Sequence, residues 1–291
     1  MDVRNFLKRL KLATGIGIKG ETLVYEWIQA HPGEFKHLSA DRIASIAQLG
    51  KTRAAFCRDF ISDDLNQRIE RHADLGWLSI VDPEYPEMLK ESFQPPIGLF
   101  YRGNIALLTA THLLAVIGTR TPTAYAYDCL EALLPEVVAD QVVVVSGLAR
   151  GIDSMSHRLT LNLGGHSIGV IGTGLDVTYP RENARLQDYM ANHELVLSEY
   201  PRDAYGQKFH FVERNRIIAG LVETLLVVEA KKKSGTLITA SLALQNNRNV
   251  LAVPGKITDL FSQGCNELIR AGAQPTLAAA DIMAEFRGNL N

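Results

Sequence analysis

The chain has 291 residues, a formal net charge of −2, 46% hydrophobic residues and 21% charged residues. These values are those of an ordinary globular protein and exclude a disordered or fibrous chain. They also exclude a protein that holds nucleic acid by bulk charge, so any site for a polyanion must be a local patch.

Cysteine usage and the first residues indicate the compartment. Cys57, Cys129 and Cys265 lie far apart, which argues against a disulfide framework or a zinc site and fits a reducing cytoplasm. The N-terminal stretch is too charged for a signal peptide, and no apolar run approaches the length of about 18 residues that a membrane span needs. We expect a cytoplasmic protein that holds no metal and uses no membrane.

Residues 1–76 predict a small all-helical domain. Apolar residues recur at helical spacing, as in Phe6, Leu7 and Leu10, and no β pattern interrupts them. After a short run at 77–81 that fits a strand, the stretch 83–103 is rich in proline and predicts a connector without regular structure. We therefore expect three parts: a helical domain over 1–76, a connector over 77–104, and a second domain over 105–291.

From residue 112 onward, strands and helices are expected to alternate. Continuous Val/Ile runs between helical segments predict a mostly parallel sheet buried on both faces, an extended Rossmann-like, doubly wound α/β fold. Thr121 is expected to cap the first helix and Pro135 to kink or end it. The expected strands are 112–117, 142–146, 166–171, 194–199, 223–229 and 249–253; the expected helices are 122–139, 151–163, 181–191, 211–221, 236–246 and 264–272, followed by a last strand and a short helix within 275–286.

Glycine-bearing turns follow three of these strands: Gly118-Thr119-Arg120, Gly147 to Gly151, and Gly172-Thr173-Gly174. The carboxyl ends of parallel strands meet at one edge, so the turns are expected to form one rim. Backbone N–H groups of such turns, next to a helix N-terminus, can bind phosphate, although a tight strand-to-helix turn alone also explains the glycines. The spacing fits neither a dinucleotide fingerprint nor a P-loop, so we expect no nucleotide cofactor and no triphosphate hydrolysis.

Basic and aromatic residues cluster near the same strand ends. Arginines suit phosphate, and rings give bases a surface to stack on, which is the pattern of single-strand binding; core packing is the alternative role of each ring. The run 231–233 is interpreted as a solvated loop, Asp153 as a first-turn residue of its helix, and Glu213 as a partner of Arg216; no nucleophile–base pair stands out. The basic residues are Arg120, Arg150, Arg181, Arg202, Lys208, Arg214, Arg216 and Lys256, and the aromatic ones Tyr125, Tyr179, Tyr200, Tyr205, Phe209 and Phe211.

The motifs SGLARGIDSMSH (146–157), VTYPRENARL (177–186), FVERNRIIAGL (211–221) and LAVPG (251–255) resemble DNA-processing protein A, also called Smf. The resemblance implies a non-enzymatic protein that binds and protects single-stranded DNA, loads the recombinase RecA onto it in natural transformation, and forms a homodimer. It implies DNA contacts by Arg120 and Arg181, and a phosphate-binding turn over Gly147 to Gly151. Val212 departs from the usual proline of this family. We expect no C-terminal winged helix before Asn291.

The expected DNA-binding residues are Gly118, Arg120, Gly147, Arg150, Gly151, Gly172, Gly174, Arg181, Arg214 and Arg216. The N-terminal helices resemble a sterile-alpha-motif-like or helix-hairpin-helix-like domain, whose turns at 14–17 and 49–52 are plain loops or contacts to the DNA backbone; protein contact remains open. An apolar tail around Leu277, Ile282, Met283 and Phe286 indicates a homodimer, or else covers the sheet edge. The rival function is a nucleotide phosphoribohydrolase, but the stretch 234–239 lacks the Pro-Gly-Gly-x-Gly-Thr loop of that family.

Overall fold

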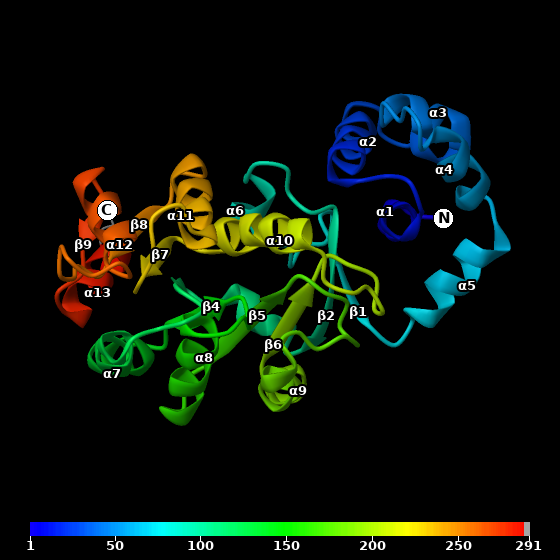
Figure 1. The fold of residues 1–291 in the computed structure, drawn as a ribbon. Coiled ribbons are helices and arrows are strands. Elements are labelled where there is room, and N and C mark those ends of the chain that lie inside the picture. Colours follow the sequence, from blue (N-terminus) through cyan, green and yellow to red (C-terminus); the bar gives the residue numbers. More distant parts are fainter. Residues whose placement is uncertain (288–291) are drawn as a thin grey trace.

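The structure is a computed structural model that describes residues 1–287; the last four residues of the expected second domain lie outside it. The described residues form one nine-stranded sheet with helices on both faces and a group of helices at the N-terminal end (Figure 1). The strands are β1 (Gly76–Ser79), β2 (Gly98–Gly103), β3 (Leu113–Ile117), β4 (Val143–Ser146), β5 (Ser167–Ile171), β6 (Leu195–Ser198), β7 (Thr224–Val227), β8 (Asn249–Ala252) and β9 (Gln274–Pro275).

The strand order is β1-β2-β6-β5-β4-β3-β7-β8-β9, and β3 to β9 are parallel. From β3 the chain adds β4, β5 and β6 on one side, then returns to place β7 on the other side of β3. This reversal makes the sheet doubly wound, as the sequence predicts. It also creates a topological switch point, where the connections leaving β3 and β7 diverge.

Each central strand is buried on both faces, which explains its continuous apolar sequence. All residues of β3 are buried; Leu114 and Val116 face one layer of the core, and Ala115 and Ile117 face the other. Figure 1 shows α7 and α8 on one face and α10 and α11 on the other. The helices of this part are α6 (Glu87–Lys90), α7 (Ala124–Ala139), α8 (Ile152–Asn162), α9 (Ala184–His193), α10 (Lys208–Leu221), α11 (Gly235–Gln245), α12 (Gln263–Arg270) and α13 (Ala279–Arg287), with 3-10 turns η2 (Ile105–Thr109) and η3 (Arg181–Asn183).

The start of α7 differs from the expectation. The N-cap is Thr123 rather than Thr121, because the backbone N–H and the Oγ1 of Thr123 donate to the carboxylate of Glu229 at 3.0 and 2.5 Å. The helix then continues through Pro135 to Ala139. These two bonds tie the helix that follows β3 to the end of β7, across the switch point.

The expectation of a connector without regular structure over 83–103 is wrong. Strands β1 and β2 pair antiparallel with each other, and β2 pairs antiparallel with β6, where Phe100 lies opposite Ser198. The prolines precede α6 and β2 and so separate these elements rather than prevent them. Trp77 and Phe100 are buried, with their ring centroids 4.9 Å apart. The 77–104 stretch therefore completes the edge of the sheet.

The first 71 residues contain helices and no strand, and they share a continuous apolar core with β1 and β2. Four buried charges join this helical part to the sheet. Lys11 Nζ lies 2.7 Å from Glu21 and 2.9 Å from Glu199, and Arg216 Nη2 lies 2.6 Å from Glu199, so the expected pair of Glu213 with Arg216 is wrong. The helices are α1 (Val3–Leu12), α2 (Ile18–Ala30), η1 (Glu34–His37), α3 (Ala40–Ile46), α4 (Arg53–Phe60) and α5 (Asp63–Arg71).

The apolar tail lies mostly inside the core. Ile282, Met283 and Phe286 of α13 are at most 3% exposed and pack in the same core layer as α7, whereas Leu277 is 77% exposed. Three of the four residues that suggested a dimer surface therefore cover the sheet, the alternative that the sequence left open.

Candidate nucleic-acid interface

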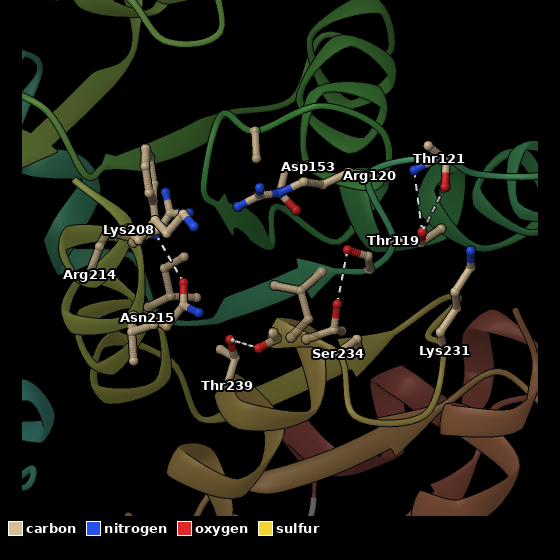
Figure 2. Close-up of a pocket in the computed structure, with 18 residues that line it drawn as sticks. Thr119, Arg120, Thr121, Asp153, Lys208, Arg214, Asn215, Lys231, Ser234 and Thr239 are labelled. Carbon is tan, nitrogen blue, oxygen red and sulfur yellow. Dashed lines mark hydrogen bonds between the residues drawn. The ribbon is translucent and has the colours of Figure 1, made fainter. Parts of the chain in front are cut away.

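A cavity of about 480 Å³ lies at the switch point, beyond the carboxyl ends of β3 and β7 (Figure 2). We call it the switch-point cavity. One side is formed by the turn after β3, with Gly118 to Thr121; the other is formed by Lys231 and the first residues of α11. Residues of α10, among them Lys208, Phe211 and Asn215, form a third side. Ligands of open α/β sheets bind at this place because the diverging connections leave a crevice there.

Three exposed cations line the switch-point cavity: Arg120, Lys208 and Lys231. Within residues 1–287 the side chain of Arg120 forms no hydrogen bond or ion pair; its guanidinium carbon lies 5.8 Å from the ring centroid of Phe211. The Nζ of Lys231 lies 4.4 Å from the ring centroid of Phe261. A guanidinium held only over a ring keeps all its donors for an anion, and phosphate matches its fork.

Two aromatic rings, those of Phe211 and Tyr179, lie next to Arg120. Phe211 lies between Arg120 and Tyr179, with the two ring centroids 5.2 Å apart and the rings inclined by 39°. Tyr179 is 52% exposed. Arg120 and Phe211 also line a smaller hollow of about 40 Å³, together with Arg150 and Gly172. A base can stack on such a surface without being identified by hydrogen bonds.

The turn Gly147 to Gly151, where the sequence predicts a phosphate cradle, lies against a carboxylate of the protein itself. Asp153, in the first turn of α8, lies against the backbone N–H groups of Gly147 and Ala149, and a Cβ on Gly147 would lie 2.5 Å from its Oδ2. Burial raises the pKa of Asp153, while Arg214 and these two N–H groups act in the opposite direction. The protein's own carboxylate thus fills the anion position at this helix N-terminus.

The glycines of the rim mainly permit close packing of protein groups. A Cβ on Gly147 would lie 2.5 Å from Arg214 Nη1 and from Asp153 Oδ2, and one on Gly172 would lie 2.9 Å from Cδ1 of Phe211. Gly151 has φ +74°, in the left-handed region. Gly118 packs against Ile152, and Gly174 against Pro201 and Arg202. The alternative interpretation, tight turns, therefore accounts for these positions.

Two of the predicted arginines point into the protein. Arg214 is 4% exposed; its Nη1 donates to the carbonyl oxygens of Gly147, at 2.5 Å, and Val170, so it fixes the turn that Arg120 faces. Arg216 is 6% exposed, is paired with Glu199, and lines a different cavity. The burial of both follows from the packing of α10 on the sheet.

The other two predicted arginines are exposed. Arg150 pairs with Glu182 at 3.0 Å and lines the smaller hollow. Arg181 begins η3, two residues after Tyr179, and lines neither cavity. Of the ten predicted site residues, Gly118, Arg120 and Arg214 line the switch-point cavity, and Arg120, Gly147, Arg150 and Gly172 line the hollow beside it.

The sequence predicts a solvated loop at Lys231, and it predicts Ser234-Gly235-Thr236 to be first a helix cap and second a phosphate-binding turn. Lys231 lies four residues after the end of β7, near the strand end that the sequence shows, and its side chain lines the cavity. Ser234 is the N-cap of α11 but its side chain makes no capping bond, and Gly235 has no atom within 4 Å of where a Cβ would be. Ser234 and Gly235 line the cavity, so the N-terminal end of α11, the end whose helix dipole favours anions, lies at the cavity.

Two further features of the described residues concern metal ligands and a buried histidine. Within residues 1–287 no group of three or more His, Cys, Asp or Glu side chains is arranged to hold a metal ion. His157 is buried, and burial lowers its pKa to about 3, so the ring is neutral; its Nδ1 lies 2.6 Å from the Oγ of Ser167. In the same part of the chain, no helix is both long and apolar enough to cross a membrane.

Comparison with known proteins identifies the family. The family model of DNA recombination-mediator protein A matches residues 76–287. DNA processing protein DprA of Streptococcus pneumoniae is 47% identical over 72% of this chain and 73% of its own length, and that of Bacillus subtilis is 44% identical over 74% and 73%. These relatives are named as DNA processing proteins and not as enzymes.

Two solved structures extend the likeness to the fold. The crystal structure of the Streptococcus pneumoniae protein has a TM-score of 0.89, with 39% identity over 98% of this chain and 99% of the other. DNA processing protein A of Helicobacter pylori, described for its single-stranded DNA binding mode, has a TM-score of 0.67, with 28% identity over 76% of this chain and 99% of its own. The chain therefore belongs to the DNA recombination-mediator protein A family, the family that its glycine and arginine motifs resemble.

Proposed function

We propose that this protein of the DNA-processing family binds single-stranded DNA in the switch-point cavity and delivers the strand to a RecA-type recombinase. The observation that carries the proposal is the unpaired guanidinium of Arg120, held over Phe211 at the mouth of the cavity. The guanidinium can bind a phosphate, and the ring beside it gives a base a surface to stack on. The single-strand binding of the Helicobacter pylori relative supports the same assignment.

The chemistry of the cavity favours backbone binding over base reading. Arg120, Lys208, Lys231 and the first turn of α11 neutralise or donate to phosphates, while Phe211 and Tyr179 stack on bases. The exposed rings of Tyr205 (77%) and Phe209 (58%) lie in the loop before α10 and at its start. Stacking tolerates any base, so binding has little sequence preference. Stacking also requires unpaired bases, so single strands bind in preference to duplex.

The direct test is competition in a fluorescence anisotropy assay with labelled oligo-dT. Unlabelled single strands of mixed sequence should compete as well as oligo-dT, and duplex of equal length should compete poorly at the same salt concentration. Equal competition by duplex would contradict the proposal.

Delivery of the strand is the proposed physiological role, in natural transformation or recombination in the cytoplasm. The family description as a recombination mediator supports it. The test is RecA-dependent strand exchange on DNA first coated with single-strand-binding protein. Addition of this protein should shorten the lag, and the variant Arg120→Glu should not.

We also propose a homodimer, on the family likeness rather than on the tail, which is mostly buried. The C-terminal third still exposes apolar side chains, with Ile257 at 87%, Leu260 at 62% and Leu277 at 77%. Light scattering at tens of micromolar checks this: a monomer mass contradicts it.

The rival function, phosphoribohydrolysis, lacks an available acid. Among the lining residues of the switch-point cavity the carboxylate is that of Asp153, which is 7% exposed and engaged with backbone N–H groups. Release of free base from nucleoside monophosphates would restore the rival.

A further inference from the structure

A second cavity, of about 870 Å³, lies between the N-terminal helices and the sheet domain. Its walls are the turn before α2 and the turn before α4 on one side, and α10, α11 and the residues around Phe93 on the other. Val212 of α10 lines both this cavity and the switch-point cavity. The two cavities are therefore neighbours across one exposed side chain.

Three glycines that line the two cavities have no structural reason to be glycine. For most glycines that the structure describes, either a positive φ or a crowded Cβ position explains the residue. Gly17, Gly50 and Gly235 have neither: no atom lies within 4 Å of the Cβ position, and φ is not in the left-handed region. All three line a cavity, Gly235 the first and the other two the second. Bare backbone facing open space leaves N–H groups accessible to a ligand.

Arg216 provides the second, independent observation. Its side chain is 7% exposed, and one nitrogen, Nη2, contacts both carboxylate oxygens of Glu199 at 2.6 Å. Its Nε and Nη1 are buried without a hydrogen-bond partner in the described residues, and Arg216 lines the second cavity. Unsatisfied buried donors on a charged group are costly, and an anion that enters the cavity would satisfy them once the Arg216 side chain turns toward it.

The remaining lining fits a nucleic-acid strand. Gly17 is the N-cap of α2 and has no side-chain cap, so the first-turn N–H groups are open, and the exposed Lys19 follows it. Phe93 is 62% exposed, Val212 47% and Ile238 44%. The lining carboxylate, Glu213, accepts the hydroxyl of Tyr200 at 2.7 Å. Open donors for phosphate thus stand beside an exposed ring for a base.

We propose that the single strand bound in the switch-point cavity crosses Val212 and continues through the second cavity, with a phosphate between Arg216 and the first turn of α2. The N-terminal helices thereby form one wall of an extended strand-binding path. This inference rests on the proposed function, because it concerns the length of the same binding site. The two cavities share Val212, and for this reason we assign the same strand to the second cavity.

The test is a length series of oligo-dT from about 4 to about 16 nucleotides, the range of single-strand-binding domains. In the wild type, affinity should rise beyond the shortest strand that fills the first cavity. Lys19→Glu and Gly17→Glu each place a negative charge in the second cavity. Each should bind the shortest strand like the wild type but the longest about tenfold more weakly, with a salt slope smaller by about 0.7.

The matched control is Lys36→Glu, which makes the same charge change at an exposed position of the helical part that lines neither cavity. It should bind every length like the wild type, and all variants should keep the wild-type melting temperature. If both cavity variants bind long strands normally, or lose affinity equally at all lengths, the second cavity is not part of the path. If the wild type binds no oligo-dT at all, the proposed function itself fails.

Discussion

Reversal of charge at Arg120 is the sharpest test of the switch-point cavity. The side chain is exposed, and its contact in the described structure is the ring of Phe211 at 5.8 Å. An exposed cation–π contact contributes about 0.5–1 kcal/mol. Loss of this contact alone should lower the melting temperature by no more than about 4 °C. The charge of Arg120 also favours the ionised form of the buried Asp153, so the melting curve of Arg120→Glu is measured before its binding.

The loss of affinity should be much larger than the loss of stability. Glutamate removes one phosphate contact and adds repulsion, which together should cost at least about 1.4 kcal/mol, or about tenfold in Kd. One lost contact to a single strand should also flatten the slope of log K against log salt by about 0.7. Both the Kd and the salt slope should change.

The assay is anisotropy titration with oligo-dT at several salt concentrations. The control is Arg158→Glu, an equal charge change at an exposed position of α8 that lines neither cavity; it should leave both quantities unchanged. A folded Arg120→Glu variant with wild-type affinity and salt slope would show that the cavity is not the DNA site.

Three further predictions follow from the site and its supports. Lys231→Glu adds a negative charge to the lining of the same cavity and should weaken oligo-dT binding about tenfold. An effect no larger than that of Arg158→Glu would favour the interpretation of Lys231 as part of a solvated loop. Arg214→Met leaves the buried Asp153 without its cation and should lower the free energy of unfolding, measured by urea denaturation, by about 3–5 kcal/mol. The double variant with Asp153→Asn should lose less than the sum of the two single variants; a loss equal to that sum would show that the two side chains do not interact. Burial raises the pKa of Glu199, but Lys11 and Arg216 outweigh burial and lower that pKa below 4.5, so the stability from this group is present above pH 4.5 and is lost as pH falls through the folded-state pKa. Glu199→Gln should therefore destabilise the protein at pH 7 and reduce the loss of stability between pH 7 and pH 3. An unchanged pH dependence of stability would refute the assignment.

The parallel part of the fold could be predicted because its signal is local. Strands buried on both faces need continuous apolar runs, as in β3 and β4, and helical spacing separates them. Strand β1 overlaps the run 77–81 that the sequence predicts as a strand. Strand β2 could not be predicted in the same way, because four prolines precede α6 and β2, and only the pairing of β2 with β6 shows that these prolines separate regular elements.

The edge of the sheet at which the candidate residues gather could be predicted, but the directions of their side chains could not. The rim and Arg120 follow from where strands end, which the sequence shows. The inward direction of Arg214 and Arg216 depends on how α10 packs on the sheet, and the local sequence does not contain that information. The same is true of Asp153: its place in the first turn of α8 was expected, but its occupation of the N–H groups of Gly147 and Ala149 needs the folded turn.

The pairing of β2 with β6 has a consequence for synthesis on the ribosome. The first strands emerge early, but the partner of Phe100 is Ser198, and Lys11 meets Glu199 only across 188 positions of sequence. Contacts between distant positions form late, because a long loop must close first. The edge of β2 that pairs with β6 therefore stays unpaired until about two thirds of the chain has emerged. During that interval the unpaired edge can bind chaperones or aggregate with other chains.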